Sequence, residues 1–256
     1  MLATVRDRLM PEHERSLVEA MMMRHRDSPR IPAPIEVVSF DLWATLLRSH
    51  PRFKQQRDQC LWELLSVRRP IEEFRRIVRA VDVLVEAACA VDGRHRGLRE
   101  RVELIARFCG ARAPLSEAIV AQVTAVQSQL VRDSPPQLVD AALPSLLTHV
   151  SSRFVVAVTS NTGFVPAHDL KWVLEHHGLA RAVSHLVFSD EVGFAKPSIR
   201  IFDHLVALAQ VQRERILHIG DNSVADGMGA RRAGIAFTLV GPEYPVTKAI
   251  ERLLAL

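Results

Sequence analysis

The sequence predicts an α/β protein: a doubly wound parallel sheet with an all-helical domain inserted after its first strand. Strand-like and helix-like stretches alternate throughout residues 150–256, which is the order of elements in a parallel sheet with crossover helices. From residue 53 to residue 150, by contrast, every periodic stretch has helical spacing. We therefore expect a core domain formed by residues 35–50 and 150–256, a helical domain over residues 51–149, and an N-terminal helix and linker over residues 1–34.

Composition and charge exclude several classes of protein. Hydrophobic residues make up 48% of the 256 residues and charged residues 24%, as in globular proteins. The net charge of +4 is modest, and no basic stripe with interleaved aromatic residues indicates a nucleic-acid partner. No stretch has the length of a membrane span, and acidic residues interrupt the N-terminus, unlike a signal or transit peptide. The three cysteines are odd in number and lack the spacing of metal ligands, which fits a reduced intracellular protein. We therefore expect a cytoplasmic protein with no membrane partner and an unspecified oligomeric state.

The first predicted strand runs directly into an acidic residue and a polar turn. Val37, Val38 and Phe40 are β-formers, and Asp41 stands where this apolar run stops. In an open parallel sheet ligands bind beyond the carboxyl ends of the strands, so Asp41 is placed where chemistry usually occurs. The alternative is a carboxylate that only caps the following turn.

The inserted domain is predicted from four apolar stripes at three- and four-residue steps. Pro70 and Pro114 begin two of these helices, and Gly110 ends another. We expect no strand between residues 60 and 145. The stripes cover residues 70–85, 102–108, 114–130 and 139–147.

The second half of the chain is predicted to supply the remaining strands and helices of the sheet. Gly178 and Gly234 mark the ends of two of these helices, because glycine is favoured just beyond a helix C-terminus. The predicted strands are residues 154–159, 186–188, 216–219 and 235–240. The predicted helices are residues 166–177, 197–208, 224–233 and 246–255.

Polar residues stand at three of the predicted strand ends: Asp41, Ser160 with Asn161, and Asp221. Parallel strands bring these ends to one edge of the sheet, so the residues can converge despite their separation in sequence. Lys196 precedes a helix start between the last two positions, and Asp226 follows Asp221 by five residues.

This set of side chains suits a carboxylate nucleophile acting beside a divalent cation. A carboxylate can attack a phosphoryl group and form an acyl phosphate. Two or three carboxylates with backbone oxygens suit Mg²⁺, whose ligands are hard oxygens. A lysine and a hydroxyl supply positive charge and hydrogen bonds for the transferring oxygens. Lys196 could instead be a structural cation paired with Asp190 or Glu191.

These motifs, taken in order, resemble those of the haloacid dehalogenase-like hydrolase superfamily over residues 35–242. Four stretches carry the resemblance: Phe40 to Leu46, Val158 to Asn161, Lys196-Pro197, and Gly220 to Asp226. The resemblance implies a Rossmann-like core, a helical cap that carries specificity, and a hydrolase that uses Mg²⁺ on a small phosphorylated metabolite. It also implies an aspartyl-phosphate intermediate.

The resemblance assigns a role to each motif residue. It implies that Asp41 is the nucleophile, with Ser160 and Lys196 as its catalytic partners. Thr45 and Asn161 are the implied phosphate- and substrate-binding residues. The implied metal ligands are Asp41, Asp221, Asp226 and the backbone carbonyl of Trp43.

One departure from the family pattern affects the expected chemistry. The family's phosphatases carry a second Asp two residues after the nucleophile, as general acid and base, and this chain has Trp43 there. An indole is only a hydrogen-bond donor and does not titrate at a useful pH. His50 is the nearest substitute in sequence. A smaller departure is Ala44 in place of the usual glycine, from which we expect an ordinary backbone conformation at that position.

Three functions therefore compete on the sequence alone. The first is a Mg²⁺-dependent phosphohydrolase acting on a substrate with a good leaving group. The second is a hydrolase of carbon–halogen bonds, since the family's dehalogenases carry an aromatic residue at the position of Trp43. The third is a catalytically weak ligand-binding or interaction protein that keeps the fold. Fold-level analogy cannot separate them.

Overall fold

The computed structural model describes residues 34–110 and 114–255, which belong to one compact unit, Pro32–Leu256. The N-terminal helix predicted within residues 1–34 lies outside the described residues. The strands are β1 Val37–Phe40, β2 Leu47–Arg48, β3 Gln137–Leu138, β4 Val155–Ser160, β5 His185–Phe188, β6 Ile216–Gly220 and β7 Ala236–Leu239. The α-helices are α3 Phe53–Leu64, α4 Ile71–Asp92, α5 Leu98–Phe108, α6 Glu117–Asp133, α7 Leu143–Ser151, α8 Ala167–His176, α9 Ser189–Val192, α10 Ile199–Ala209, α11 Gly229–Arg232 and α12 Val246–Leu254.

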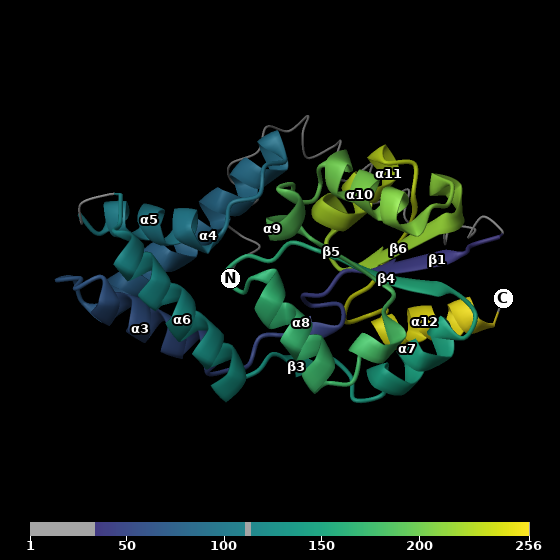
Figure 1. The fold of residues 1–256 in the computed structure, drawn as a ribbon, viewed down its shortest axis with the longest axis horizontal. Helices are drawn as coiled ribbons and strands as arrows, with labels where there is room; N and C mark the ends of the chain where they lie inside the picture. Colours follow the sequence, from purple (N-terminus) through teal and green to yellow (C-terminus); the bar gives the residue numbers. More distant parts are fainter. Residues whose placement is uncertain (1–33, 111–113, 256) are drawn as a thin grey trace. The chain divides into compact units, whose positions relative to one another are not determined.

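Five strands form a parallel sheet in the order β5-β4-β1-β6-β7 (Figure 1). The chain starts at the central strand β1, builds one half of the sheet with β4 and β5, and then returns to build the other half with β6 and β7. This reversal of direction, next to β1, is the topological switch point at which ligands bind in doubly wound sheets. The predicted fold class is confirmed.

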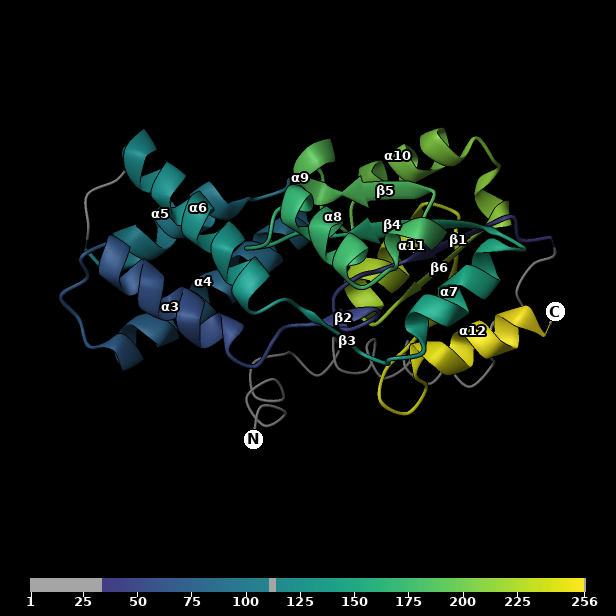
Figure 2. The same cartoon turned by 60° about the horizontal axis from the view of Figure 1, so that its bottom comes forward.

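Helices cover both faces of the sheet. Helices α10 and α11 pack on one face, and α7 and α12 pack on the other (Figures 1 and 2). Because both faces are covered, the central strands are continuous runs of buried residues, as parallel strands usually are. The core on the α10 side consists of Val37, Ala157, Val187, Ile201, Phe202, Leu205, Ile216, Ala230, Ala233, Ile235 and Phe237.

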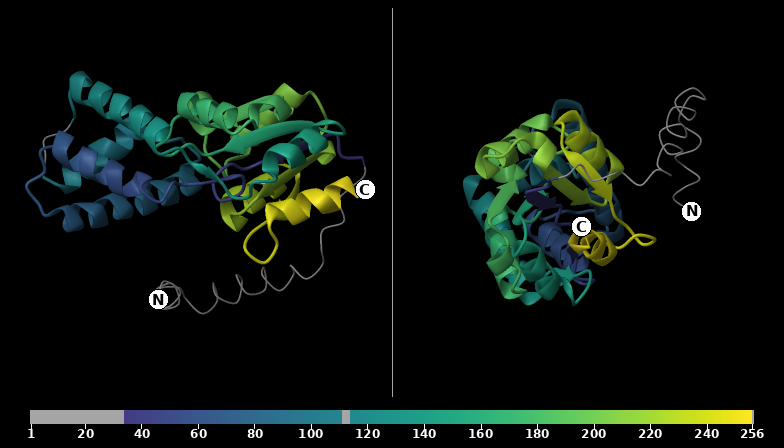
Figure 3. Two further views of the ribbon diagram at one scale, coloured as in Figure 1. Left: turned by 90° about the horizontal axis from the view of Figure 1, so that it is seen from below. Right: turned by 90° about the vertical axis from the view of Figure 1, so that its right-hand side faces the viewer.

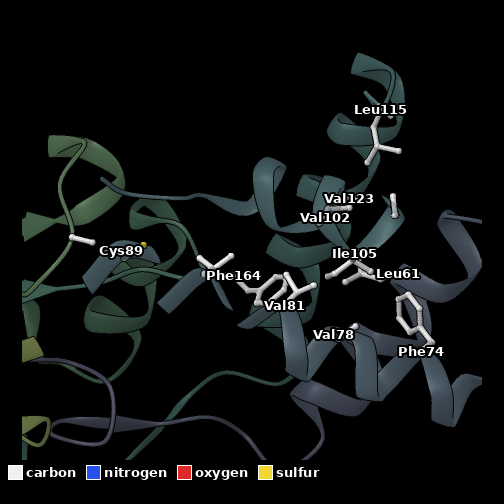
Figure 4. Packing of buried hydrophobic residues seen from close by; sticks show 13 residues of the cluster. Leu61, Phe74, Val78, Val81, Cys89, Val102, Ile105, Leu115, Val123 and Phe164 are labelled. Atoms are coloured by element: carbon white, nitrogen blue, oxygen red, sulfur yellow. The ribbon is translucent and has the colours of Figure 1, made fainter. Parts of the chain in front are cut away.

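Helices α3 to α6, here called the helical insert, pack together beyond the carboxyl ends of the strands (Figure 3). Their core forms because α4 buries Phe74, Val78, Val81 and Val85 along one side, at the spacing of an amphipathic helix. Phe164, from the loop after β4, is buried in the same apolar cluster (Figure 4). The loop that follows the second motif is thus anchored in the insert.

Three elements differ from the sequence-based expectation. β2 and β3 pair as a short antiparallel ribbon, so a strand does occur between residues 60 and 145. Helix α7, which we counted with the inserted domain, packs against β4 and α12. The predicted helix over residues 224–233 is a π-helical turn, Ser223–Met228, followed by the short α11. In that turn Asn222 Oδ1 accepts hydrogen bonds from the backbone N–H groups of Val224 and Ala225.

Among the helices in the described ranges, none combines the length and the apolar character needed to cross a lipid bilayer.

Candidate active site

Asp41 lies immediately after β1, at the switch point of the sheet, and only 6% of its surface is exposed. Its Oδ1 accepts a hydrogen bond from Ser160 Oγ at 2.9 Å and one from Lys196 Nζ at 2.6 Å. Ser160 reaches Asp41 because it ends β4, which runs parallel to β1 with Phe40 opposite Val158. The three residues predicted to be catalytic are therefore in direct contact.

Lys196 is 3% exposed, and all three of its ammonium protons have acceptors. Besides Asp41, Nζ donates to the backbone carbonyl of Thr159 at 2.9 Å and to Asp226 Oδ1. Asn161 holds the backbone of Lys196, because its Oδ1 accepts from Lys196 N at 2.8 Å and its Nδ2 donates to Lys196 O at 3.1 Å. The structure thus places the Asn161 amide on the lysine loop.

The alternative partners of Lys196 are engaged elsewhere. Glu191 forms an ion pair with Lys171, and Asp190 Oδ2 accepts a hydrogen bond from Ala167 N at 2.8 Å. Lys196 is therefore not the structural counter-ion of either acidic residue.

The loop before Lys196 is also tied to the helical insert by backbone hydrogen bonds. Ala195 N donates to Gly93 O at 2.9 Å, and His95 N donates to Gly193 O at 3.0 Å. The His95 ring adds a hydrogen bond between Nδ1 and Ser189 Oγ at 2.9 Å. The lysine loop is thus fixed on one side by Asn161 and on the other by the insert.

Asp226 is 1% exposed and is held on both carboxylate oxygens. Oδ2 accepts a hydrogen bond from Asn222 N at 3.0 Å, and Oδ1 accepts from Lys196 and from His218 Nε2 at 3.1 Å. A Cβ atom on Gly220 would lie 2.4 Å from the Asp226 carboxyl group, so the close approach of Asp226 to β6 requires glycine there.

Asp41, Asp221, Asp226 and Lys196, here called the sheet-edge cluster, perturb one another's pKa values. Burial raises the pKa of Asp41, and Asp226 adds to that effect while Lys196 opposes it. Burial, Asp41 and Asp226 raise the pKa of Asp221 to about 6. Burial acts to raise the pKa of Asp226 too, but Lys196 and the hydrogen bond from His218 hold it below its ordinary value. Burial disfavours the charged form of Lys196, but Asp226 and Asp41 raise its pKa.

The sheet-edge cluster has the donor set of a divalent metal site. Ligand oxygens of Asp41, Asp221 and Asp226 all lie within 4.8 Å of one another. Among the described residues, the ammonium group of Lys196 forms ion pairs with Asp41 and Asp226, and burial together with these two carboxylates raises the pKa of Asp221. Hard carboxylate oxygens with excess negative charge fit a hard divalent cation, so the residues present are suited to hold one.

The turn after β1 contains two further predicted site residues. Thr45 is fully buried, and its Oγ1 has no hydrogen-bond partner among the described residues. Trp43 is half-buried and forms an isolated backbone bridge with Leu47. Ala44, between them, has φ of 58°, so the expected ordinary conformation is wrong. The turn requires the left-handed region that glycine adopts without a Cβ penalty, and Ala44 occupies it at a cost.

Two histidines change the interpretation of the site. His50 Nδ1 accepts a hydrogen bond from Arg52 N at 3.2 Å, so this ring is part of the turn before α3. His218, which the sequence analysis did not single out, contacts Asp226 directly. The signal that could have revealed it is a polar residue inside the otherwise apolar strand β6.

The family model for haloacid dehalogenase-like hydrolases matches residues 35–234, a span that includes Asp41, Ser160, Lys196, Asp221 and Asp226. The chain belongs to this family. It is 36% identical over 93 residues to the pyrimidine 5'-nucleotidase YjjG of Escherichia coli, which covers 36% of this chain and 40% of that protein. The chain thus spans well under two thirds of the length of this curated relative.

Solved structures show the same haloacid dehalogenase-like fold over most of the chain. YfnB from Bacillus subtilis, whose structure holds bound magnesium, aligns with a TM-score of 0.66 and 18% identity, covering 87% of this chain and 99% of YfnB. The 2-haloacid dehalogenase from Pseudomonas syringae aligns with a TM-score of 0.61 and 19% identity, covering 87% and 99% of the two chains. At such low identity these likenesses show the fold alone.

Proposed function

We propose that this haloacid dehalogenase-like hydrolase is a Mg²⁺-dependent phosphohydrolase that forms a phosphoryl intermediate on Asp41. The observation that carries the proposal is the contact of Asp41 Oδ1 with Ser160 and Lys196, within reach of two further carboxylates. One side of this arrangement suits an anionic phosphoryl group, and the other suits a divalent cation. The similarity to a nucleotidase supports a phosphorylated molecule as substrate.

In the proposed reaction a carboxylate oxygen of Asp41 forms a bond to phosphorus while the bond from phosphorus to the leaving oxygen breaks. Ser160 Oγ and Lys196 Nζ, both on Asp41 in this structure, provide hydrogen bonds and positive charge for the transferring oxygens. Water then attacks the aspartyl phosphate, which releases inorganic phosphate and restores the carboxylate. The buried and unpartnered Thr45 Oγ1 is available as a further hydrogen-bonding group.

The proposed cation is Mg²⁺, held by Asp41, Asp221, Asp226 and the backbone carbonyl of Trp43. When bound, Mg²⁺ supplies positive charge to the phosphoryl oxygens. The protein's own part is to keep these carboxylates close together, with Gly220 leaving room for Asp226.

The expected substrate is a small phosphorylated molecule whose leaving oxygen is weakly basic. Trp43 stands two residues after the nucleophile and cannot give a proton to that oxygen. Acyl and aryl phosphates need little protonation when they leave, whereas alkyl phosphates need it most. We therefore expect turnover in the order acyl, aryl, alkyl.

A substrate panel tests the proposal. Acyl, aryl and alkyl phosphates are assayed with and without Mg²⁺, beside 2-haloacids, with Asp41→Asn as the inactive control. We expect phosphate release only with Mg²⁺ and only in the wild type. Halide release from 2-haloacids, or phosphate release that survives in Asp41→Asn, would show that the proposal is wrong.

A second candidate, a ligand-binding protein with weak catalysis, is favoured by Trp43 itself. A positioned general acid contributes about 10²–10⁴-fold to such reactions, and this chain has no Asp in that place. Calorimetry on the same samples separates the two functions. Binding of Mg²⁺ and a phosphate compound without turnover of any phosphate in the panel would favour the second candidate.

A further inference from the structure

We propose that His218 is a positioning residue of the active site, which holds Asp226 in place through a hydrogen bond donated by its Nε2–H. The effect on turnover rests on the proposed function, whereas the effects on metal affinity and on the ring itself do not.

His218 lies in the middle of β6, with no exposed surface. Its Nε2 is 3.1 Å from Asp226 Oδ1, and its Nδ1 is 3.1 Å from Ser39 Oγ. Ser39 is opposite His218 on β1, and its Oγ is hydrogen-bonded to Thr159 Oγ1 at 2.9 Å. Three neighbouring strands thus contribute one polar side chain each to a buried chain of hydrogen bonds that ends at Asp226.

The direction of the contact with Asp226 follows from the other donors around its carboxylate. Lys196 donates to Oδ1 as an ion-pair partner and Asn222 N donates to Oδ2, so the carboxylate acts as an acceptor on both oxygens. His218 Nε2 must therefore be the donor, whichever way the hydroxyl of Ser39 is turned. The hydroxyl contacts Nδ1 and fixes the far side of the ring.

Aromatic packing limits the freedom of the His218 ring. The ring of Phe202 stands edge-on to it at a centroid distance of 5.2 Å and an angle of 80°, and Phe237 lies 6.3 Å away. In this buried position water cannot replace a lost donor, so the full cost of an unsatisfied carboxylate oxygen would be felt. A polar residue in a central strand is costly to bury, and here its hydrogen bonds offset that cost.

The influence of His218 extends to the nucleophile through two further contacts. Asp226 Oδ1 also accepts from Lys196, and Lys196 donates to Asp41 Oδ1. Loss of the His218 donor would free Asp226 to shift toward Lys196. Residues that orient metal ligands in this way typically contribute about 10–100-fold to metal affinity or activity.

Two substitutions at position 218 separate hydrogen bonding from packing. In His218→Gln the side-chain amide nitrogen reaches the place of Nε2 and keeps a donor for Asp226. In His218→Asn the shorter amide reaches only the place of Nδ1, so it can meet Ser39 but not Asp226. Both variants lose the ring and its contacts with Phe202. His204→Asn, on the exposed side of α10, is the matched control.

Mg²⁺ affinity by calorimetry is the main measurement, made on protein that circular dichroism shows to be folded. We expect His218→Asn to bind Mg²⁺ about 10–100-fold more weakly than wild type, and His218→Gln to recover most of that loss. Ser39→Ala should give a smaller loss in the same direction. Equal losses in the Asn and Gln variants, or none in either, would show that the ring only fills space.

Nitrogen NMR of the wild type gives a test that needs no variant at position 218. A one-bond coupling to hydrogen at His218 Nε2 is expected in the metal-free protein, and an unprotonated Nε2 would overturn the proposal. In the turnover assay, kcat should fall in His218→Asn while KM changes little. If the wild type hydrolyses no phosphate, the proposed function fails, but calorimetry and NMR still decide the role of His218.

Discussion

The molecule contains two groups of buried charge that are balanced differently. In the helical insert each buried arginine has a carboxylate of its own: Arg57 contacts Asp58 at 2.7 Å, and Arg101 contacts Asp82 at 2.8 Å. At the sheet edge, among the residues that the structure describes, the ammonium group of Lys196 is shared by Asp41 and Asp226, and Asp221 adds a third carboxylate. Each buried arginine of the insert thus contacts a carboxylate, whereas at the sheet edge the three carboxylates outnumber the one ammonium group described there.

This difference distinguishes a structural use of charge from a functional one. The guanidinium groups of Arg57 and Arg101 lie 4.2 and 5.5 Å from the centre of the Phe164 ring, so they help to anchor the loop after β4. Their carboxylate partners make that burial tolerable. The sheet-edge cluster has more carboxylates than ammonium groups, and perturbed pKa values of this kind are common at functional sites.

The largest expected effect is on the free energy of unfolding. Loss of a carboxylate should lower it in the helical insert but not at the sheet edge. Asp58→Asn leaves Arg57, which is 4% exposed, without its counter-ion. We expect this to lower the free energy of unfolding by about 3–5 kcal/mol. Asp41→Asn instead removes one of three crowded carboxylates, so the metal-free protein should lose no stability. Urea unfolding at neutral pH measures both.

Equal changes in the free energy of unfolding in Asp58→Asn and Asp41→Asn would contradict this difference between the two groups. Asp133→Asn, at the exposed end of α6, is a control in which a carboxylate is lost from the surface. It should stay within about 0.5 kcal/mol of wild type.

A second test increases the imbalance at the sheet edge. Trp43→Asp places a carboxyl group where the family's phosphatases have their general acid, and turnover of alkyl phosphates should rise by something up to about 10²–10⁴-fold. Aryl phosphates, with weakly basic leaving oxygens, should gain much less. The assay needs saturating Mg²⁺, because another carboxylate near Asp41 and Asp221 adds repulsion. Equal turnover of alkyl and aryl esters by the wild type, with no change in the variant, would mean that another residue supplies the proton.

A third test removes one negative charge from the sheet-edge cluster, by Asp221→Asn, and follows protein stability as a function of pH. The pKa of Asp221 is raised to about 6 from an ordinary value of 3.8, so the folded protein binds this proton more tightly than the unfolded chain. The group's stabilising contribution is complete below pH 3.8 and is lost as the pH rises through about 6. Above that pH, metal-free Asp221→Asn should be more stable than wild type by about 1 kcal/mol, after allowance for solvent screening of a half-buried group.

The same substitution should weaken Mg²⁺ binding markedly, because it removes one charge at nearly constant shape. Thermal unfolding between pH 4 and pH 8, with and without Mg²⁺, shows both effects. A stability difference that persists unchanged at pH 4, or equal Mg²⁺ affinities, would contradict the assignment of Asp221.

The smallest expected effect concerns the backbone beneath the cluster. Ala44→Gly relieves a left-handed conformation at φ of 58°, and it should stabilise the fold by about 0.5–1 kcal/mol once the greater freedom of unfolded glycine is counted. Ala80→Gly is the control, because Ala80 is also exposed but lies inside helix α4, where glycine is less favourable than alanine. It should be destabilising. Denaturant midpoints that move the same way in both variants would show that φ at Ala44 causes no strain.

The strands of the sheet and the residues of the sheet-edge cluster were predictable because both follow from local pattern. Apolar runs mark β1, β4 and β6, and parallel pairing then brings their carboxyl ends together. Asp41, Ser160 and Lys196 could be expected to meet for that reason. Their contacts are confirmed by the structure, while their catalytic roles remain predictions.

Other features could not be predicted, because their causes are not local. Helix α3 buries Arg57 and Asp58 where an amphipathic helix would bury apolar residues, so it has no clear stripe. The ribbon of β2 and β3 joins two-residue strands across a long separation in sequence. The conformation of Ala44 depends on a turn in which the Ala44 N–H donates a hydrogen bond to Leu47 O, and an alanine does not by itself indicate a left-handed conformation.

All three N–H groups of the Lys196 ammonium are already engaged in hydrogen bonds. Its three N–H bonds point at Asp41, the Thr159 carbonyl and Asp226, so an incoming oxyanion can meet the ammonium group only by exchange with one of them. Thr159 O is part of β4, and Asp226 is held by Asn222 as well. Asp41 is the partner that the proposed reaction would draw away, because its oxygen would bond to phosphorus. In that reaction, capture of an oxyanion by Lys196 and release of the Asp41 oxygen would be one event.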